Sequence, residues 1–148
     1  MSKGFLIAVC IIIAIALILF PLVISYKEQG PADLSSIDAL ILPGVGSFDP
    51  AIDNLHATGL VPHLKAWGKN NRPLLGICLG LQLLFQRSDE GSNDGLGLFQ
   101  GAVERLHSHP NERIPHMGLA PLTVERNFPL LHNDDLTSWV YFVHSYAA

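Results

Sequence analysis

The feature that most constrains the fold is a cysteine between two glycines at the junction of two apolar segments. Gly76-Ile77-Cys78-Leu79-Gly80 closes the short apolar run of residues 74–77 and leads into the leucine-rich run of residues 79–86. A short apolar run is typical of a buried strand, and a longer leucine-rich run is typical of a helix. The segment therefore predicts a strand, a sharp turn at Cys78 and a helix.

This pattern is that of a nucleophile elbow with cysteine as the nucleophile. The glycines are needed because side chains on either side of so tight a turn would collide with neighbouring backbone. A cysteine at a helix N-terminus faces the positive end of the helix dipole, which favours the reactive thiolate, and the N–H of Leu79 would point at a developing oxyanion. The alternative is that Cys78 is a small buried hydrophobic residue.

A second glycine-containing loop supports the first. Pro43-Gly44-Val45-Gly46 follows the apolar run of residues 38–42. Two glycines allow a peptide N–H to turn toward a ligand, although an ordinary turn is the alternative. Loops at the carboxyl ends of parallel strands face one crevice, so we expect both loops to do so.

The rest of this region predicts an α/β fold with a mostly parallel sheet. Ser47 and Asp49 are N-cap candidates before Pro50, and the helix that follows is interrupted near Gly59 and ends at Gly68. Beyond Gly91 the pattern changes to short strands, which predict an antiparallel extension. The strands expected there are residues 102–106, 122–125 and 139–143.

The first 30 residues differ from the rest. Residues 5–25 carry no charged side chain and form a run long enough to cross the roughly 30 Å hydrocarbon core as a helix. A buried strand that runs into a core helix is the alternative. Residues 26–36 are polar and contain Gly30-Pro31, which predicts a boundary between an apolar, membrane-compatible segment at 1–30 and a domain at 31–148.

Charge and cysteine content exclude several classes of function. The net charge of −4 predicts no broad basic surface, and therefore no nucleic-acid partner. Cys10 and Cys78 are the only two cysteines, which gives no disulfide framework and no metal-ligand spacing.

Five motifs resemble the glutamine-hydrolysing amidotransferase subunits of imidazole glycerol phosphate synthases, which are class I glutamine amidotransferases. They stand in the order and approximate spacing of that family and cover about three quarters of the chain. The motifs are LPGVGSF at residues 42–48, GICLGLQLLF at 76–85, GLGLFQGAV at 95–103, IPHMG at 114–118 and WVYFVHSY at 139–146.

The resemblance implies a flavodoxin-like sheet, a cytoplasmic location and an activity without cofactor or metal. It implies that Cys78 attacks the carboxamide of glutamine and that the ammonia passes to a (βα)8-barrel cyclase subunit, in a heterodimer that serves histidine biosynthesis. It also implies the other site residues: Gly44, Val45, Gly46 and Leu79 in the oxyanion hole, and Gln82, His144, Ser145 and Tyr146 around the substrate.

Three departures from the family pattern lead us to expect impaired activity. The family's catalytic histidine and glutamate follow the YFVHSY motif as a His-x-Glu pair, and this chain ends at Ala148 before such a pair. Residues 1–30 lack the family's first loop and amphipathic helix, and Leu119-Ala120 replaces the usual Trp-Asn in a segment that touches the cyclase. A membrane-anchored, non-catalytic binding module and a nonfunctional fragment are the alternatives.

Overall fold

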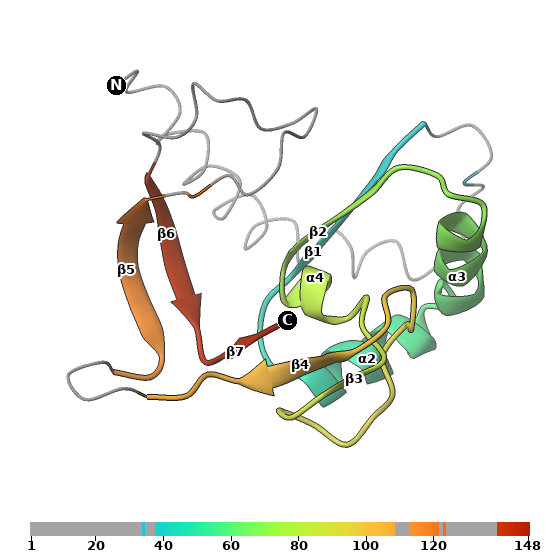
Figure 1. Ribbon diagram of the computed structural model, residues 1–148. Coiled ribbons are helices and arrows are strands. Elements are labelled where there is room, and N and C mark those ends of the chain that lie inside the picture. Colours follow the sequence, from blue (N-terminus) through green and yellow to red (C-terminus); the bar gives the residue numbers. More distant parts are fainter. Residues whose placement is uncertain (1–33, 35–37, 109–112, 122, 124–138) are drawn as a thin grey trace. The chain divides into compact units, whose positions relative to one another are not determined.

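The computed structural model describes residues 34, 38–108, 113–121, 123 and 139–148 (Figure 1). Its contacts divide the chain into two compact units, one that extends to Val103 and includes Ala148, and one that covers residues 104–147. The apolar run of residues 5–25 and the boundary near residue 30 lie outside the described residues and stay predictions. Within the described ranges, no helix is long and apolar enough to cross a membrane.

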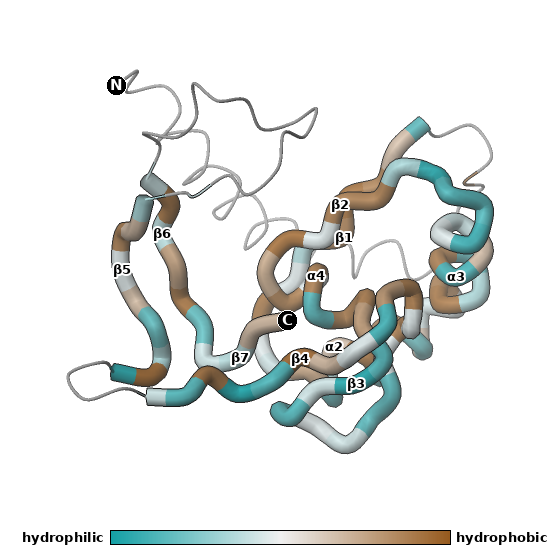
Figure 2. The backbone as a smooth tube through the Cα atoms, viewed as in Figure 1, coloured by the Kyte–Doolittle hydropathy of each residue, from teal (hydrophilic) through white to brown (hydrophobic). Residues whose placement is uncertain are grey.

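The first unit is built on two parallel strands. β1 (Leu40–Gly44) pairs with β2 (Leu74–Cys78) in a register that runs from Leu40 opposite Leu74 to Gly44 opposite Cys78. The connection between them carries α2 (Phe48–Ala57) and α3 (Val61–Lys69), as the interruption at Gly59 predicted. Both strands are strongly apolar along their length (Figure 2). The expected parallel α/β unit is therefore present.

Two apolar clusters hold this unit together. Phe48 and Ile52 of α2 form the first cluster with residues that directly follow β2. Val61 and Leu64 of α3 form the second cluster with residues later in the chain, and apolar side chains of β1 and β2 pack against it. Each large side chain removed from water contributes about 1.5–3 kcal/mol. The first cluster is completed by Leu79 and Leu83; the second contains Leu84 and Leu96, with Leu40, Leu42, Leu55, Leu60, Leu74 and Leu98 packed against it.

The turn into β2 is fixed by Trp67. Its indole N–H donates to the carbonyl of Pro73 at 2.9 Å, and the guanidinium of Arg72 lies 3.4 Å from the centre of its ring. Trp67 is only 2% exposed, so it joins α3 to the residue before β2 in a buried contact. This contact sets where β2 begins, and hence where its carboxyl end presents Cys78.

The N-terminus of α2 is held by side chains from a distant loop. Ser47 occupies the N-cap position as predicted, but its side chain makes no capping hydrogen bond. Instead, Glu90 accepts the N–H of Phe48 at 3.0 Å. The carboxylate of Asp49 accepts the N–H of Ser92 at 2.9 Å and that of Asn93 at 3.0 Å. The predicted N-cap position of Ser47 is therefore confirmed, but the capping hydrogen bond comes from Glu90, and Asp49 fastens the distant loop rather than capping the helix.

Acid should therefore loosen this loop through Asp49. Hydrogen bonds from the backbone of Ser92 and Asn93 lower the pKa of Asp49 below its usual value. A carboxylate with a lowered folded pKa contributes stability above the unfolded pKa, and that contribution is lost as pH falls through the folded pKa. We expect the urea midpoint to fall as the pH drops below about 5 and through the lowered folded pKa of Asp49, and to fall less in Asp49→Asn. Asp38→Asn, at an exposed carboxylate, is the control, and an equal fall in both variants would contradict the assignment to Asp49.

The helix after Cys78 is shorter than predicted. α4 covers only Leu79–Gln82, whereas a helix over residues 79–86 was expected. The N–H groups of Leu84 and Phe85 donate to carbonyls only three residues back, and the N–H of Gln86 donates to the carbonyl of Gly101 instead of to that of Gln82. The carbonyls of residues 83–86, which a helix ending at residue 86 would leave without a partner, accept N–H groups of residues 95–99.

Short strands follow, in part as expected. β4 (Ala102–Arg105) and β6 (Trp139–His144) confirm two of the predicted strands. In the first unit β3 (Arg87–Ser88) runs parallel to the start of β4, and in the second unit the end of β4 pairs antiparallel with β7 (Tyr146–Ala147). The expected strand at residues 122–125 lies outside the described residues except for Thr123.

The second unit contains an antiparallel strand pair that the sequence did not predict in full. β5 (His116–Pro121) pairs with β6 from His116 opposite His144 to Pro121 opposite Trp139. β5 was missed because Gly118 and Pro121 interrupt it and its alternation is weak. Together with β4 and β7, the pair confirms the antiparallel extension.

Candidate active site

Cys78 occupies the strained turn that its sequence predicted. It ends β2, precedes α4 and has φ 55° and ψ −125°. A side chain other than glycine rarely adopts a positive φ, and such strain persists only where surrounding structure enforces it. The thiol is exposed, so Cys78 is not the buried hydrophobic residue of the alternative interpretation. The geometry is that of a nucleophile on an elbow.

Three glycines allow backbones to pack directly around this turn. A Cβ on Gly76 would lie 2.5 Å from the Cα of Leu81, and a Cβ on Gly44 would lie 2.5 Å from the nitrogen of Gly80. A Cβ on Gly80 would overlap the carbonyl oxygen of Leu42. The end of β1, the end of β2 and the first turn of α4 are thus in contact through main chain.

The expected oxyanion donors lie around the cysteine. Gly44 is opposite Cys78 in the β1–β2 register, and Val45 and Gly46 continue from it, with Gly46 at φ 101°. Leu79 is the first residue of α4, so its N–H has no acceptor within the helix. The structure therefore brings Gly44, Cys78 and Leu79 together, with residues 45 and 46 directly following.

Gln82 closes the short helix α4, which begins directly after Cys78. Its side chain is half-buried. This placement agrees with a role next to the nucleophile.

His144, Ser145 and Tyr146 connect β6 to β7 in the second unit. His144 Nδ1 lies 3.0 Å from the carbonyl oxygen of Tyr146, and the carbonyl of Ser145 accepts the N–H of Leu106 at 2.9 Å. His116, which no sequence argument singled out, lies with its Nδ1 3.2 Å from His144 Nε2. Only the register of β5 on β6 reveals this contact, because the two residues are 28 positions apart. The assignment of residues 144–146 to the substrate stays a prediction.

The family model of the class-I glutamine amidotransferases matches residues 15–148. This chain belongs to the class-I glutamine amidotransferase family. The elbow at Cys78 and the glycine loop at residues 44–46 are the parts of the described structure in which the nucleophile and oxyanion site of such an amidotransferase would lie.

Curated relatives agree with the resemblance to imidazole glycerol phosphate synthase subunits. The chain is 87% identical over 120 residues to imidazole glycerol phosphate synthase subunit HisH of Synechococcus sp. (strain CC9902), a match that covers 81% of this chain and 56% of the relative. It is 69% identical over 116 residues to imidazole glycerol phosphate synthase subunit HisH of Synechococcus sp. (strain CC9605), a match that covers 78% of this chain and 54% of the relative. The chain thus spans about half the length of the curated relatives it matches.

Proposed function

We propose that this amidotransferase chain supplies the nucleophile and oxyanion hole of a glutamine-hydrolysing subunit of imidazole glycerol phosphate synthase. The observation that carries the proposal is the exposed thiol of Cys78 at a positive φ, directly opposite Gly44. The relatives' names support the same assignment. They do not favour a membrane-anchored binding module or a nonfunctional fragment.

The proposed chemistry begins with attack of the Cys78 thiolate on the carboxamide carbon of glutamine. The C–O π electrons move to oxygen, and the N–H groups of Leu79 and of the loop at residues 44–46 stabilise the oxyanion. When the carbonyl re-forms, the C–N bond breaks and ammonia leaves with an added proton, so that a γ-glutamyl thioester remains. Water then hydrolyses the thioester to glutamate and frees the thiol.

Gln82, His144, Ser145 and Tyr146 are proposed to hold the glutamine, as the resemblance implies. The protons of this reaction need a general base, which the family supplies from a His-x-Glu pair. The 148 residues of this chain contain no His-x-Glu sequence.

Ammonia release from glutamine tests the proposal. We would measure it for the chain, with and without the cyclase subunit, and for Cys78→Ala under the same conditions. A rate that depends on Cys78 and rises with the cyclase would support both the chemistry and the partner. Equal rates in the chain and in Cys78→Ala would contradict a role for the thiol.

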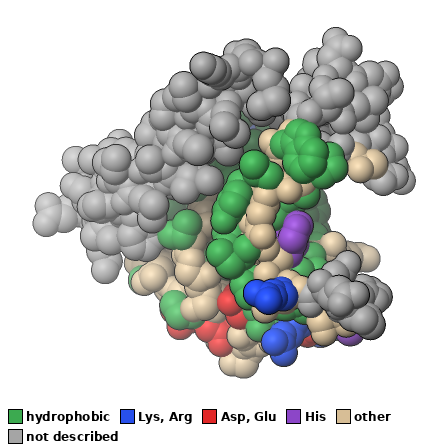
Figure 3. Space-filling model, turned by 90° about the vertical axis from the view of Figure 1, so that its left-hand side faces the viewer, with side chains coloured by type: hydrophobic (Ala, Val, Ile, Leu, Met, Phe, Trp, Pro, Cys, Tyr) green, Lys and Arg blue, Asp and Glu red, His purple; other side chains and the backbone are tan. Residues whose placement is uncertain are grey.

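An exposed apolar face supports the proposed docking of a cyclase subunit. Alternate residues of β5 and β6 share one face of the strand pair, and its large apolar side chains are each more than half exposed (Figure 3). Exposed apolar patches commonly mark protein interfaces. The exposed residues are Met117, Leu119, Trp139, Tyr141 and Val143.

The residue at position 119 should set the strength of this docking. Leu119 is 55% exposed and lies opposite Tyr141 in the strand register. We expect Leu119→Asp to weaken cyclase binding by at least about tenfold, since an interface charge without a partner must be desolvated. Leu119→Trp, which restores the residue common in the family, should strengthen binding.

Calorimetric titration of the cyclase into each variant measures this effect. Ile41→Asp is the matched control, because Ile41 is equally apolar, is 63% exposed and belongs to the first unit. Unchanged affinity in Leu119→Asp, or an equal loss in Ile41→Asp, would contradict docking through the β5–β6 face.

A further inference from the structure

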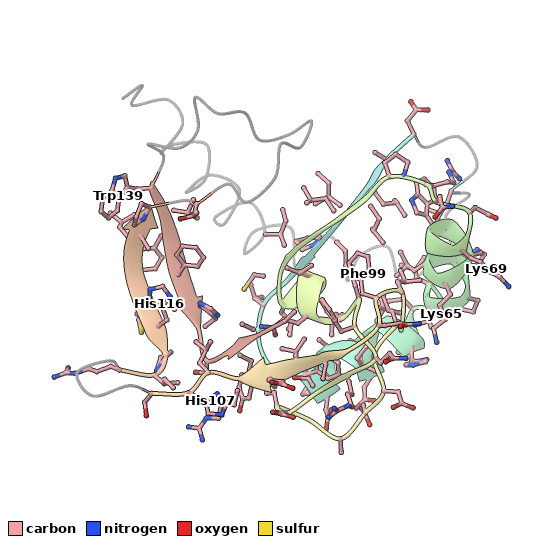
Figure 4. The ribbon with its side chains drawn as sticks, viewed as in Figure 1. Lys65, Lys69, Phe99, His107, His116 and Trp139 are labelled. Carbon is pink, nitrogen blue, oxygen red and sulfur yellow. The ribbon has the colours of Figure 1, made fainter. Side chains whose placement is uncertain are left out.

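Two imidazole rings meet at one end of the β5–β6 strand pair. His116 begins β5 and His144 ends β6, and the two are direct partners in the antiparallel register. The distance from His116 Nδ1 to His144 Nε2 is 3.2 Å. Figure 4 labels His116 on β5, next to the strand that carries His144. The sequence offers no metal-ligand spacing here, because the pair depends on strand register alone.

We propose that these two nitrogens form a chelating site for a divalent transition metal ion, with Cu²⁺ preferred over Ni²⁺ and Zn²⁺. Imidazole nitrogens bind such ions at about 2.0–2.1 Å. Two nitrogens 3.2 Å apart then subtend an angle of about 100° at the metal, which lies between the square-planar and tetrahedral values. The strands already hold the two nitrogens at a chelating separation, and the rings must turn so that both lone pairs meet at the ion.

The surroundings of His144 prepare it as a ligand. The carbonyl oxygen of Tyr146 can only accept a hydrogen bond, so the His144 Nδ1 at 3.0 Å carries the proton and donates it. The neutral ring then has its lone pair on Nε2, the nitrogen that lies near His116. A histidine ligand that donates its other N–H to a backbone carbonyl is the usual arrangement at metal sites.

His116 stacks on Phe142, and a change of tautomer can free the lone pair of its Nδ1 for a metal ion. Its ring stacks on Phe142 with centroids 5.3 Å apart and an interplanar angle of 21°. In the metal-free pair His116 Nδ1–H donates to His144 Nε2. On metal binding that proton transfers through solvent to Nε2 of His116, which exchanges one neutral tautomer for the other. Nδ1 then offers its lone pair to the ion.

The site would be open rather than closed. Among the residues that the structure describes, no group of three or more His, Cys, Asp or Glu side chains could hold a metal. Two protein nitrogens leave further coordination positions for water or an added ligand. Alternation along the strands also places His116 and His144 on the opposite face from Leu119 and Tyr141, so that the site and the apolar docking face are separate.

Nuclear magnetic resonance of the unmodified chain gives the first test. With histidine side chains labelled with ¹⁵N, Zn²⁺ should shift Nδ1 of His116 and Nε2 of His144, and Cu²⁺ should broaden these two signals at the lowest concentration. The nitrogens of His56, His63 and His107 should respond only at much higher concentration. Equal responses at all histidines would overturn the proposal.

Variants give the second test. His116→Gln and His144→Gln should each weaken Cu²⁺ binding by about tenfold or more, because the second ligand of a chelate binds at high effective concentration. His107→Gln, at an exposed histidine of the same unit, is the control and should bind as the unmodified chain does. Unchanged affinity in His116→Gln, an exposed position whose replacement leaves the core intact, would also overturn the proposal.

Discussion

Replacing Cys78 with alanine should abolish covalent modification of the chain by a chloromethyl ketone analogue of glutamine. The thiolate displaces chloride from the methylene carbon, which forms a C–S bond and releases a chloride ion. This step needs an exposed thiol at the glutamine site but no general acid to protonate a leaving ammonia, because chloride leaves as an anion. The expected result is therefore independent of the His-x-Glu residues on which full turnover depends.

Two features of the site lead us to expect complete loss of modification in Cys78→Ala. Cys78 holds a positive φ at the carboxyl end of β2, and its thiol is exposed. The proposal assigns the N–H groups of Leu79 and of the loop at residues 44–46 to the ketone oxygen of the analogue. Together they should give one modified cysteine per chain, seen by mass spectrometry as a single added mass.

Cys10→Ala is the matched control, because Cys10 is the chain's other cysteine. It should leave modification unchanged, and an excess of glutamine should slow modification where asparagine does not. If Cys78→Ala were modified as fast as the unaltered chain, the proposed nucleophile would be wrong. If glutamine gave no protection, the proposed substrate would be wrong.

The elbow could be predicted from the sequence because its determinants are local. Gly76, Cys78 and Gly80 stand within five residues, and a Cβ on Gly76 would meet the backbone of Leu81 in the same turn. The strands and helices before it also follow from local apolar periodicity.

Features that depend on distant partners could not be predicted in this way. The N–H of Gln86 donates to the carbonyl of Gly101 rather than to a carbonyl of the helix after Cys78, and Glu90 rather than the side chain of Ser47 caps α2. The contact between His116 and His144 likewise needs the register of two strands. In each case the deciding partner is far away in sequence, where periodicity carries no information.

Gly80→Ala should destabilise the first unit strongly, although it adds only one methyl group. The new Cβ would overlap the carbonyl oxygen of Leu42 and would lie 2.7 Å from the Leu42 carbonyl carbon. Both of these atoms are backbone within a paired strand, so neither can move without disturbing the β1–β2 register. We expect a loss of about 3 kcal/mol or more in the free energy of unfolding, measured by urea denaturation.

Gly59→Ala separates this clash from the ordinary cost of replacing glycine. Gly59 has φ 71°, and no atom lies within 4 Å of the position that an added Cβ would take. Alanine at this position would therefore have backbone strain but no steric clash. Gly59→Ala should lower the free energy of unfolding by about 1–2 kcal/mol. If Gly80→Ala cost no more than Gly59→Ala, the end of β1 would not be packed on the first turn of α4. The N–H groups of residues 44–46 would then lack the backbone contact that holds them beside Cys78, and the oxyanion site would have to be formed by other donors.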